Sequence, residues 1–595
     1  MCGICGEYQW RGNVASEHRI AQMLKHLERR GPDDHGMYIH RQIGLGHQRL
    51  AIIDLSSAGH QPMHNANKTL SIVFNGTIYN YPQLRKELRD LGVTFASTGD
   101  TEVILKAFEV WGENCVERLI GMFAFAIWDA RKNKLFIARD RLGIKPFYYA
   151  VTNESFLFAS NTQALLATSK IDTDIDAQAL QHQLTLHAVI PAPRTILKGI
   201  RKLPPAHFMW IGEDGVSEPK QYWALSARRT QQKHESEWIE DIQQALQLAV
   251  DRRLEIADVP VGVLLSGGLD SSLLVGLLAQ KHDEVNTYSV GFEDQPEERG
   301  HEFEYSDAVV EKFNTNHHRF HIANDQVLAR LPEAIRCMPE PMVAQDAVAF
   351  YLLAEQVSKD IKVVQSGQGA DEVFAGYFWY PKMHQASGTH LERFSSYYFD
   401  RDYDEYVNTV NQEFIKEDYT SALVKTALEE SDSDDLIDAV LHFDVTTLIV
   451  DDPVKRVDSM TMAWGLEARV PFLDHELVEL AMTMPPELKL RDGGKYALKK
   501  IARGLIPDAV IDRPKGYFPM PALKYVRGEF FDMVRDTLMS SACLQRGLFS
   551  RDYIDMLLDA PDQHHTRLQG SKVWHMALLE LWLQSNVDVA AYPSR

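Results

Sequence analysis

The strongest constraint on the fold is an apolar strand that runs directly into a glycine turn and then into a helix. Residues 261–265 read Val-Gly-Val-Leu-Leu, and residues 266–272 read Ser-Gly-Gly-Leu-Asp-Ser-Ser. Backbone N–H groups and the helix dipole at such a turn attract phosphate, and the glycines allow a ligand to approach the backbone closely. The lysine of the Walker-type loop is missing. The segment therefore predicts a phosphate loop of another type within an α/β sheet.

The sequence around this loop alternates between strands and helices, as a parallel sheet with helices packed on it requires. Helices are expected at about 236–255 and from Ser271, and strands at 259–265, 287–292 and 361–365. Beyond these elements, from residue 387 onward, the chain is predicted to be mostly helical.

A second glycine turn, Ser366-Gly367-Gln368-Gly369-Ala370-Asp371, follows the last of these strands. Ligands of a doubly wound sheet lie beyond the carboxyl ends of neighbouring strands, so the two turns are expected to face one nucleotide. Asp270 and Asp371 are then candidate ligands of a magnesium ion that takes its remaining oxygens from phosphate. A turn that only caps a helix is the alternative interpretation.

The first 215 residues have a different pattern. Short strand-like runs at 43–47, 70–74, 123–129 and 134–139 are joined by turns, and an amphipathic helix is predicted at 81–91. These features predict an α+β layer domain. The polar stretch 224–237 lacks apolar periodicity and is interpreted as a connector. We therefore expect two domains, at residues 2–215 and 236–595, which a chain of 595 residues is long enough to form.

Charge and composition exclude several classes of partner. The formal net charge of -21 repels nucleic acid and anionic lipid. The longest apolar stretch, 119–128, is too short for a membrane span, and the N-terminus does not resemble a secretory signal. Five scattered cysteines do not form a disulfide framework. The sequence predicts a cytoplasmic protein with neither nucleic acid nor membrane as a partner.

Cys2 directly follows the initiator methionine, so removal of one residue would leave a thiol and a free α-amine on the same residue. A free α-amine has a pKa of about 7.7–8.0, near enough to neutrality to accept a proton from an attacking thiol. The alternative is a small residue in a first strand. Metal or redox use of the Cys2-x-x-Cys5 pair is disfavoured, because no second pair or nearby histidine cluster completes a zinc site.

Several further segments share one resemblance. They are Arg-Arg-Gly-Pro-Asp at 29–33, Gly-His-Gln-Arg-Leu at 46–50, Phe-Asn-Gly-Thr-Ile-Tyr-Asn at 74–80 and Ser-Thr-Gly-Asp-Thr-Glu at 97–102. With Cys2 they resemble the glutaminase domain of class II glutamine amidotransferases. With the loop at 266–272, and with landmarks at 203–207, 465–474 and 513–516, nearly the whole chain resembles the glutamine-hydrolysing asparagine synthetase family.

This resemblance implies an α+β N-terminal-nucleophile glutaminase domain. An α/β ATP-pyrophosphatase synthetase domain would follow, of the PP-loop type that is similar to adenine nucleotide alpha hydrolases, with a helical C-terminal part. It leaves open whether the chain forms a homodimer.

The resemblance implies a role for each residue of the glutaminase site. Cys2 would attack the side-chain amide of glutamine and form a thioester. The Asn75 side chain and the Gly76 N–H would stabilise the oxyanion, at roughly 3 kcal/mol per donor. Arg49 would bind the α-carboxylate as a forked pair, and Asp100 would bind the α-ammonium.

In the synthetase domain the resemblance implies that ATP activates a small carboxylate as an acyl-adenylate. Ammonia released at Cys2 would reach the adenylate uncharged, through a shielded passage between the domains. Lys515 would neutralise charge on the adenylate or pyrophosphate, although a surface lysine is the alternative. The predicted ATP-binding residues are Leu264, Ser266, Gly267, Gly268, Asp270, Ser271, Ser272, Val290, Ser366 and Gly367, and the predicted Mg²⁺ ligands are Asp270 and Asp371.

Two positions depart from the family. Thr77 stands where the family usually has a glutamate, so the ammonium of glutamine loses a carboxylate and weaker binding is expected. Gln368 stands where the family has a glutamate thought to position aspartate and to accept a proton from ammonia, and glutamine cannot act as a base.

The acceptor follows from a narrower resemblance. Segments 185–195 and 367–377 are most similar to the N-acetylglutaminylglutamine amidotransferase subgroup, which is taken to amidate the terminal carboxylate of an acetylated dipeptide and so form a neutral osmoprotectant. The acetylated dipeptide is therefore the preferred acceptor. Aspartate is the alternative, and a catalytically silent homologue is a second one.

Overall fold

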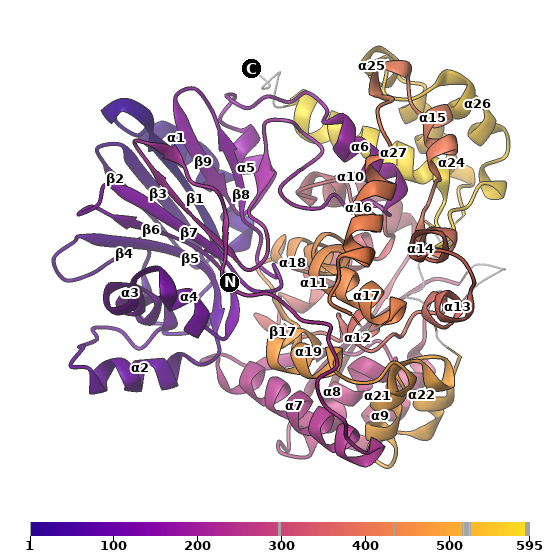
Figure 1. Ribbon diagram of the computed structural model, residues 1–595, viewed down its shortest axis with the longest axis horizontal. Coiled ribbons are helices and arrows are strands. Elements are labelled where there is room, and N and C mark those ends of the chain that lie inside the picture. The colour runs from indigo at the N-terminus through magenta and orange to yellow at the C-terminus, as the bar shows by residue number, and fades with distance from the viewer. Residues whose placement is uncertain are drawn as a thin grey trace.

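The computed structural model describes residues 2–294, 299–433, 435–514, 516, 523 and 525–589. Two halves lie side by side, with a strand-rich first half at the left of Figure 1 and a largely helical second half at the right.

The first half is built around two antiparallel sheets that pack face to face. One has the strand order β10-β8-β9-β1-β3-β2, and the other has β12-β11-β7-β6-β5-β4 with β13 paired to β11. Ile4 and Tyr8 from the first sheet share a core with Ala124 and Trp128 from the second. The strands are β1 Cys2–Gln9, β2 Asp34–His40, β3 Ile43–Arg49, β4 Met63–His64, β5 Leu70–Ile78, β6 Gly121–Asp129, β7 Lys134–Arg139, β8 Tyr148–Val151, β9 Ser155–Ala159, β10 Arg201–Lys202, β11 His207–Gly212, β12 Gly215–Val216 and β13 Lys220–Gln221.

Helices cover the outer faces of this sandwich. α1 packs on β1 and β3 through Ile20 and Met23, and α3 packs on β5 with Ile104 and Phe108 in a separate core. The order of layers is therefore helix, sheet, sheet, helix, which confirms the predicted α+β layer domain. The helices of this half are α1 Glu17–Lys25, α2 Tyr81–Asp90, α3 Asp100–Trp111, α4 Cys115–Arg118, α5 Thr162–Leu166 and α6 Ala177–Thr185.

The second half contains a five-stranded sheet with the order β16-β15-β14-β17-β18, and every neighbouring pair is parallel. The strand order reverses beside β14, and the crevice at such a switch point is where this kind of sheet binds ligands. Both glycine turns begin there, after β14 and β17. The strands are β14 Val261–Leu264, β15 Asn286–Phe292, β16 Asn316–Ile322, β17 Val363–Gln365 and β18 Glu467–Arg469.

The predicted helical character of the remaining chain is confirmed. The sheet is flanked by α7 Glu235–Glu255, α8 Leu269–Ala279, α9 Phe303–Phe313, α10 Asn324–Cys337 and α11 Asp346–Val357. The helices that follow are α12 Ala370–Val373, α13 Trp379–Gln385, α14 His390–Tyr398, α15 Tyr403–Thr409, α16 Tyr419–Glu429, α17 Leu436–Phe443, α18 Lys455–Met462, α19 His475–Met482, α20 Glu487–Leu490, α21 Tyr496–Ala502, α22 Asp508–Asp512, α24 Gly528–Leu538, α25 Ser541–Arg546, α26 Arg551–Asp559 and α27 Lys572–Leu583.

Buried ion pairs join the two halves. Lys145 Nζ and Arg30 Nη2 of the first half each lie 3.0 Å from the Asp458 carboxylate of α18. Lys202 Nζ lies 2.7 Å from Asp451 Oδ1 and 3.0 Å from Glu340 Oε2. All of these side chains are at least nine-tenths buried, and removal of one partner from such a pair costs about 3–5 kcal/mol because the other charge stays in the interior. These pairs fix the docking of the two halves.

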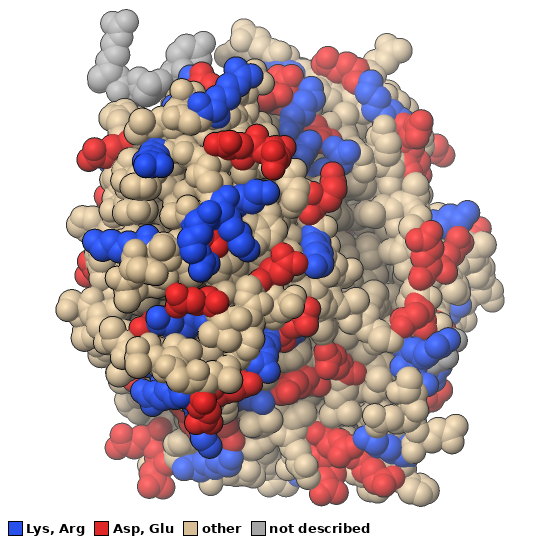
Figure 2. All heavy atoms as spheres, turned by 60° about the vertical axis from the view of Figure 1, so that its left-hand side comes forward, with Lys and Arg blue, Asp and Glu red and all other residues tan. Residues whose placement is uncertain are grey.

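On the face drawn in Figure 2, acidic and basic side chains alternate without a large basic area. No helix in the described part of the chain combines the length and apolarity needed to cross a bilayer.

Two candidate active sites

Cys2 is the first described residue and the first residue of β1, opposite Arg49 in the register of β1 with β3. Its backbone N–H donates to Asn75 Oδ1 at 3.0 Å, and its carbonyl accepts from Arg30 Nε at 3.3 Å. The residue is buried, and this burial raises the pKa of the thiol. A thiol in this environment stays protonated at neutral pH, so it needs a base close by to act as a nucleophile.

The neighbours of Cys2 on β5 provide hydrogen-bond donors. Asn75 is fully buried, and its Nδ2 has no hydrogen-bond partner among the described residues. A buried amide without a partner is costly unless a ligand accepts its hydrogen bond. At Gly76 a Cβ atom would lie 2.2 Å from the Met122 carbonyl oxygen on β6, so only glycine lets the strands pair closely here.

Two charged residues of the predicted glutamine site are held by hydrogen bonds to the backbone. The Arg49 guanidinium donates to the Ser56 carbonyl at 3.1 Å and also to the Asp54 carbonyl, which fixes its orientation. Asp100 starts α3, and its Oδ2 accepts from the Ile78 N–H at 3.0 Å. Burial raises the pKa of Asp100 to about 6.

One pocket collects the predicted glutamine site except for Asn75, which is not among the residues that line it. Cys2, Arg49, Gly76, Thr77 and Asp100 all line it. The pocket also has a wall residue that sequence reasoning missed, Glu467, which comes from β18 in the second half. Because Glu467 and Thr77 are far apart in the chain, no local pattern could have indicated that they meet.

The first glycine turn of the second half adopts the expected conformation. Gly267 has φ +78°, in the left-handed region, and a Cβ there would lie 2.8 Å from the Ser306 backbone nitrogen. The Ser266 N–H donates to Ser271 Oγ at 3.2 Å, and the Gly268 N–H donates to Ser266 Oγ at 3.3 Å. α8 begins directly after Gly268. The turn therefore delivers backbone N–H groups and serine hydroxyls to the N-terminus of a helix.

The second glycine turn packs against the first. A Cβ at Gly367 would lie 3.0 Å from the Asp270 Cβ, and the Ser366 N–H donates to the Arg469 carbonyl at 2.8 Å. The prediction that both turns face one ligand agrees with this contact, since a single cavity of about 880 Å³ borders both. It is lined by the predicted residues Leu264, Ser266, Gly268, Asp270, Ser271, Val290, Ser366, Gly367 and Asp371.

Two of the predicted ATP-binding residues do not appear on this wall. Gly267 packs against the Ser306 backbone, and Ser272 is fully buried within α8. The predicted catalytic residue Lys515 lies outside the described residues, while Pro514 and Gly516, on either side of it, do line the cavity.

A lysine that sequence reasoning did not predict as a site residue lies between the two predicted metal ligands. Lys495 Nζ is 2.6 Å from Asp270 Oδ2 and 2.9 Å from Asp371 Oδ1. Although burial opposes it, the charges of Asp270 and Asp371 raise the pKa of Lys495 above its usual value. The Gly493-Gly494 pair directly before Lys495 was the one available sequence signal.

The same geometry bears on the predicted metal ligands Asp270 and Asp371. Their two carboxylates share one ammonium and so converge on a single cation position, and carboxylate oxygen suits Mg²⁺.

The far end of this cavity carries further polar groups. Gln368, Tyr377 and Arg456 line it, and Arg456 Nε lies 2.8 Å from Asp346 Oδ1. The Tyr377 hydroxyl donates to Glu372 Oε1 at 2.8 Å. Burial, and then the charge of Asp371, raise the pKa of Glu372 to about 7. Two basic residues that do not line this cavity form buried ion pairs elsewhere: Lys455 Nζ lies 3.4 Å from Glu340 Oε2, and Arg469 Nε lies 2.6 Å from Glu467 Oε1.

Comparison with known proteins agrees with this arrangement. The family model of the glutamine amidotransferase domain matches residues 1–223, and the model of asparagine synthase matches residues 241–584. Asparagine synthetase [glutamine-hydrolyzing] 3 of Bacillus subtilis is 33% identical, with 99% of this chain and 100% of that protein covered. The chain belongs to the glutamine-hydrolysing asparagine synthetase family.

A second relative in this family, asparagine synthetase [glutamine-hydrolyzing] 1 of Bacillus subtilis, is 31% identical over 100% of this chain and 98% of its own length. A glutamine phosphoribosylpyrophosphate amidotransferase structure from B. subtilis covers 44% of this chain and 60% of its own chain, at 17% identity and a TM-score of 0.30.

Membership of the asparagine synthetase family makes this protein a glutamine-dependent carbon–nitrogen ligase with ATP as a substrate. The predicted N-terminal-nucleophile and ATP-pyrophosphatase folds are confirmed with it.

Proposed function

We propose that the Cys2 pocket, the front pocket, hydrolyses glutamine. We propose further that the cavity between the two glycine turns, the rear cavity, forms and amidates an acyl-adenylate. The two sites correspond to the proposed domains, residues 2–215 and 236–595, although β13 at Lys220–Gln221 still pairs with the first half. The observation that carries this proposal is the unpartnered Asn75 Nδ2 beside Cys2, because a buried donor next to a nucleophile is what an oxyanion requires.

In the front pocket, the Cys2 thiol would pass its proton to the α-amine that methionine removal exposes, and sulfur would attack the side-chain carbon of glutamine. The Asn75 Nδ2 and Gly76 N–H would donate to the oxyanion. The proton would then move to the leaving nitrogen, so that ammonia departs and a thioester remains for water to cleave. Arg49 would bind the α-carboxylate, while Asp100 would bind the α-ammonium.

In the rear cavity, an acceptor carboxylate would attack the α-phosphorus of ATP and release pyrophosphate. Ammonia would then attack the acyl carbon, the bond from this carbon to the AMP oxygen would break, and the proton that nitrogen loses would pass to water, with AMP as the leaving group. N–H groups of the Ser266–Ser271 turn would hold pyrophosphate, while Leu264 and Val290 would contact the nucleotide. Lys495 would stabilise the negative charge that develops on phosphate, a role that we extend to Lys515 from the sequence.

Asp270 and Asp371 would hold Mg²⁺, which when bound supplies a positive charge against the phosphate oxygens. The convergence of both carboxylates on Lys495 Nζ supports this assignment.

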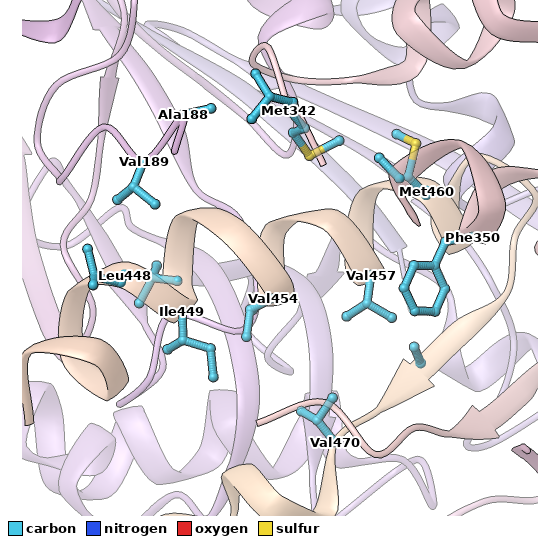
Figure 3. Packing of buried hydrophobic residues seen from close by; sticks show 14 of the residues in the cluster. Ala188, Val189, Met342, Phe350, Leu448, Ile449, Val454, Val457, Met460 and Val470 are labelled. Carbon is cyan, nitrogen blue, oxygen red and sulfur yellow. The ribbon is translucent and has the colours of Figure 1, made fainter. Parts of the chain in front are cut away.

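Ammonia would pass between the sites along α18. Arg456 of this helix lines the rear cavity, and Asp458 binds Arg30, which in turn binds the Cys2 carbonyl. Figure 3 shows Leu448, Val454, Val457 and Met460 along this helical stretch, and Ala188 and Val189 of the first half belong to the same buried cluster. Such an apolar environment, which excludes water, would keep ammonia unprotonated during transfer.

For the acceptor, we propose the terminal carboxylate of N-acetylglutaminylglutamine. Its amide groups are compatible with an uncharged Gln368 on the cavity wall, and a cavity of about 880 Å³ supplies a large volume for a dipeptide beside the nucleotide. Aspartate is the second candidate, favoured by the relatives that carry the name asparagine synthetase.

Pyrophosphate release tests the proposal directly. Each acid is supplied with ATP, Mg²⁺ and glutamine, and we expect turnover with the acetylated dipeptide. Turnover with aspartate alone would transfer the proposal to asparagine synthesis. Turnover with neither acid would favour the catalytically silent homologue if mass spectrometry also shows that the initiator methionine is retained.

A further inference from the structure

The front pocket has a carboxylate that comes from the other half of the protein. Glu467, the first residue of β18, is fully buried and lines the pocket beside Cys2, Arg49, Thr77 and Asp100. A buried acid at an interface is ordinarily a partner for a buried base. Here the acid also forms part of the wall of a ligand pocket.

Hydrogen bonds from Thr77 and Arg469 help to fix the orientation of this carboxylate. Thr77 Oγ1 donates to Glu467 Oε1 at 3.3 Å, and Arg469 Nε donates to the same oxygen at 2.6 Å. Arg469 is itself held by the carbonyls of Arg253, at 2.7 Å, and Ile256, at 2.8 Å. The strand β18 thus presents Glu467 in one position against the front pocket.

The charges of the pocket indicate what this carboxylate would bind. Glutamine brings an α-carboxylate, for which Arg49 is available, and an α-ammonium. Burial raises the pKa of Asp100 to about 6, and the negative charge of Glu467 adds to that rise. Two carboxylates that repel each other in one buried pocket are stabilised when a cation lies between them. Thr77 adds a hydroxyl to this end of the pocket but no charge.

We propose that Glu467 is a glutamine-binding residue, whose carboxylate reaches across the interface and binds the α-ammonium of glutamine together with Asp100. This inference rests on the proposed function of the front pocket. It implies that the glutamine site is complete only when the two halves are docked, because β18 belongs to the sheet that carries the second glycine turn.

A pair of substrates isolates this interaction. Glutaramate is glutamine without the α-amino group, so it needs no ammonium partner. For Glu467→Gln we expect kcat/KM for glutamine to fall at least about tenfold, as loss of a buried charge partner implies, with a much smaller change for glutaramate. Glu333→Gln is the matched control. Glu333 also crosses the interface, 2.8 Å from Arg29, but lies outside the pocket, and we expect kcat/KM for both substrates to be unchanged.

Rescue provides the second readout. The double variant Glu467→Gln with Thr77→Glu returns a carboxylate to the pocket from β5 of the first half. We expect its preference for glutamine over glutaramate to recover. If Glu467→Gln does not fold, Glu467→Asp gives the same comparison, since it keeps a charge on β18 and withdraws it by one methylene group.

Equal losses for glutamine and glutaramate, or no recovery with Thr77→Glu, would overturn the inference and leave Glu467 with a structural role only. Failure of the proposed function looks different. In that case Cys2→Ala would retain glutamine-driven turnover whatever residue stands at position 467.

Discussion

The front and rear sites are built from different kinds of structure. In the front pocket, Cys2, Arg49 and Asn75 are held on paired strands, where each backbone is fixed by its neighbours. The rear cavity is bordered mainly by turns and short helices beyond the ends of β14 and β17, together with Gly516 and residues between Asp492 and Pro514.

This difference has a physical consequence. A site on paired strands positions its atoms without further adjustment, which suits a reaction on one small invariant substrate. A site made of turns can adapt to ATP, pyrophosphate and an acceptor in succession, as loops on a rigid scaffold commonly do. We therefore expect variants of the front pocket to affect one nitrogen source only, and variants of the rear cavity to affect both.

The largest effect should come from Cys2→Ala, which removes the proposed nucleophile. Glutamine-driven synthesis should fall about a thousandfold or more, while synthesis from added ammonia continues in the rear cavity. Pyrophosphate release with each nitrogen source measures both activities. Loss of both would show that the two sites do not work separately.

Lys495→Met should distinguish the rear cavity in the opposite way. The variant removes the cation between Asp270 and Asp371, so pyrophosphate release should fall about 10²–10³-fold with glutamine and with ammonia alike. Lys281→Met, which removes an exposed partner of Asp251, serves as the control and should leave both rates unchanged. A loss confined to glutamine would contradict the assignment of Lys495 to the rear chemistry.

Asn75→Ala tests the oxyanion role in the front pocket. Removal of one donor should lower kcat of glutamine hydrolysis about 10²–10³-fold with little change in KM, because the hydrogen bond would form mainly in the transition state. Steady-state kinetics separates the two constants. A change in KM alone would mean that Asn75 only holds Cys2 in place.

Asp458→Asn tests the connection between the sites. It leaves Arg30 and Lys145 without their shared carboxylate in a buried interface, so the free energy of unfolding should fall by about 3–5 kcal/mol. Looser docking should also let ammonia escape, so that glutamate forms in excess of pyrophosphate. Denaturant titration and the ratio of these two products measure the effects. An unchanged product ratio in a destabilised protein would argue against a passage along α18.

The smallest effect is a dependence of glutamine use on pH. The pKa of Asp100 is raised to about 6, so its carboxylate gains a proton as the pH falls through that value and then no longer attracts an ammonium. kcat/KM for glutamine should therefore decline below about pH 6, with Asp100→Asn flattening this part of the profile. A wild-type profile without a step near this pH would contradict the role given to Asp100.

Sequence reasoning reached most of the local features of this protein. The helix predicted at 236–255 is observed at Glu235–Glu255, and the strands predicted at 287–292 and 361–365 are β15 and β17. Both glycine turns were found because their pattern is local: φ values and close contacts that only glycine permits leave a direct trace in the chain. Strand ends were less well predicted, since β14 spans Val261–Leu264 rather than 259–265, and pairing rather than apolar character decides where a strand stops.

The sequence by itself therefore determined the two folds and indicated a candidate nucleophile at Cys2 and a glycine turn at Ser266, because each is encoded in a few consecutive residues. Only the tertiary structure decided that Lys495 joins Asp270 and Asp371, and that Glu467 forms part of the wall of the glutamine pocket. Those contacts depend on how one sheet docks against the other and on which strand forms its edge. Such choices are made by the packing of whole layers, which no short segment records.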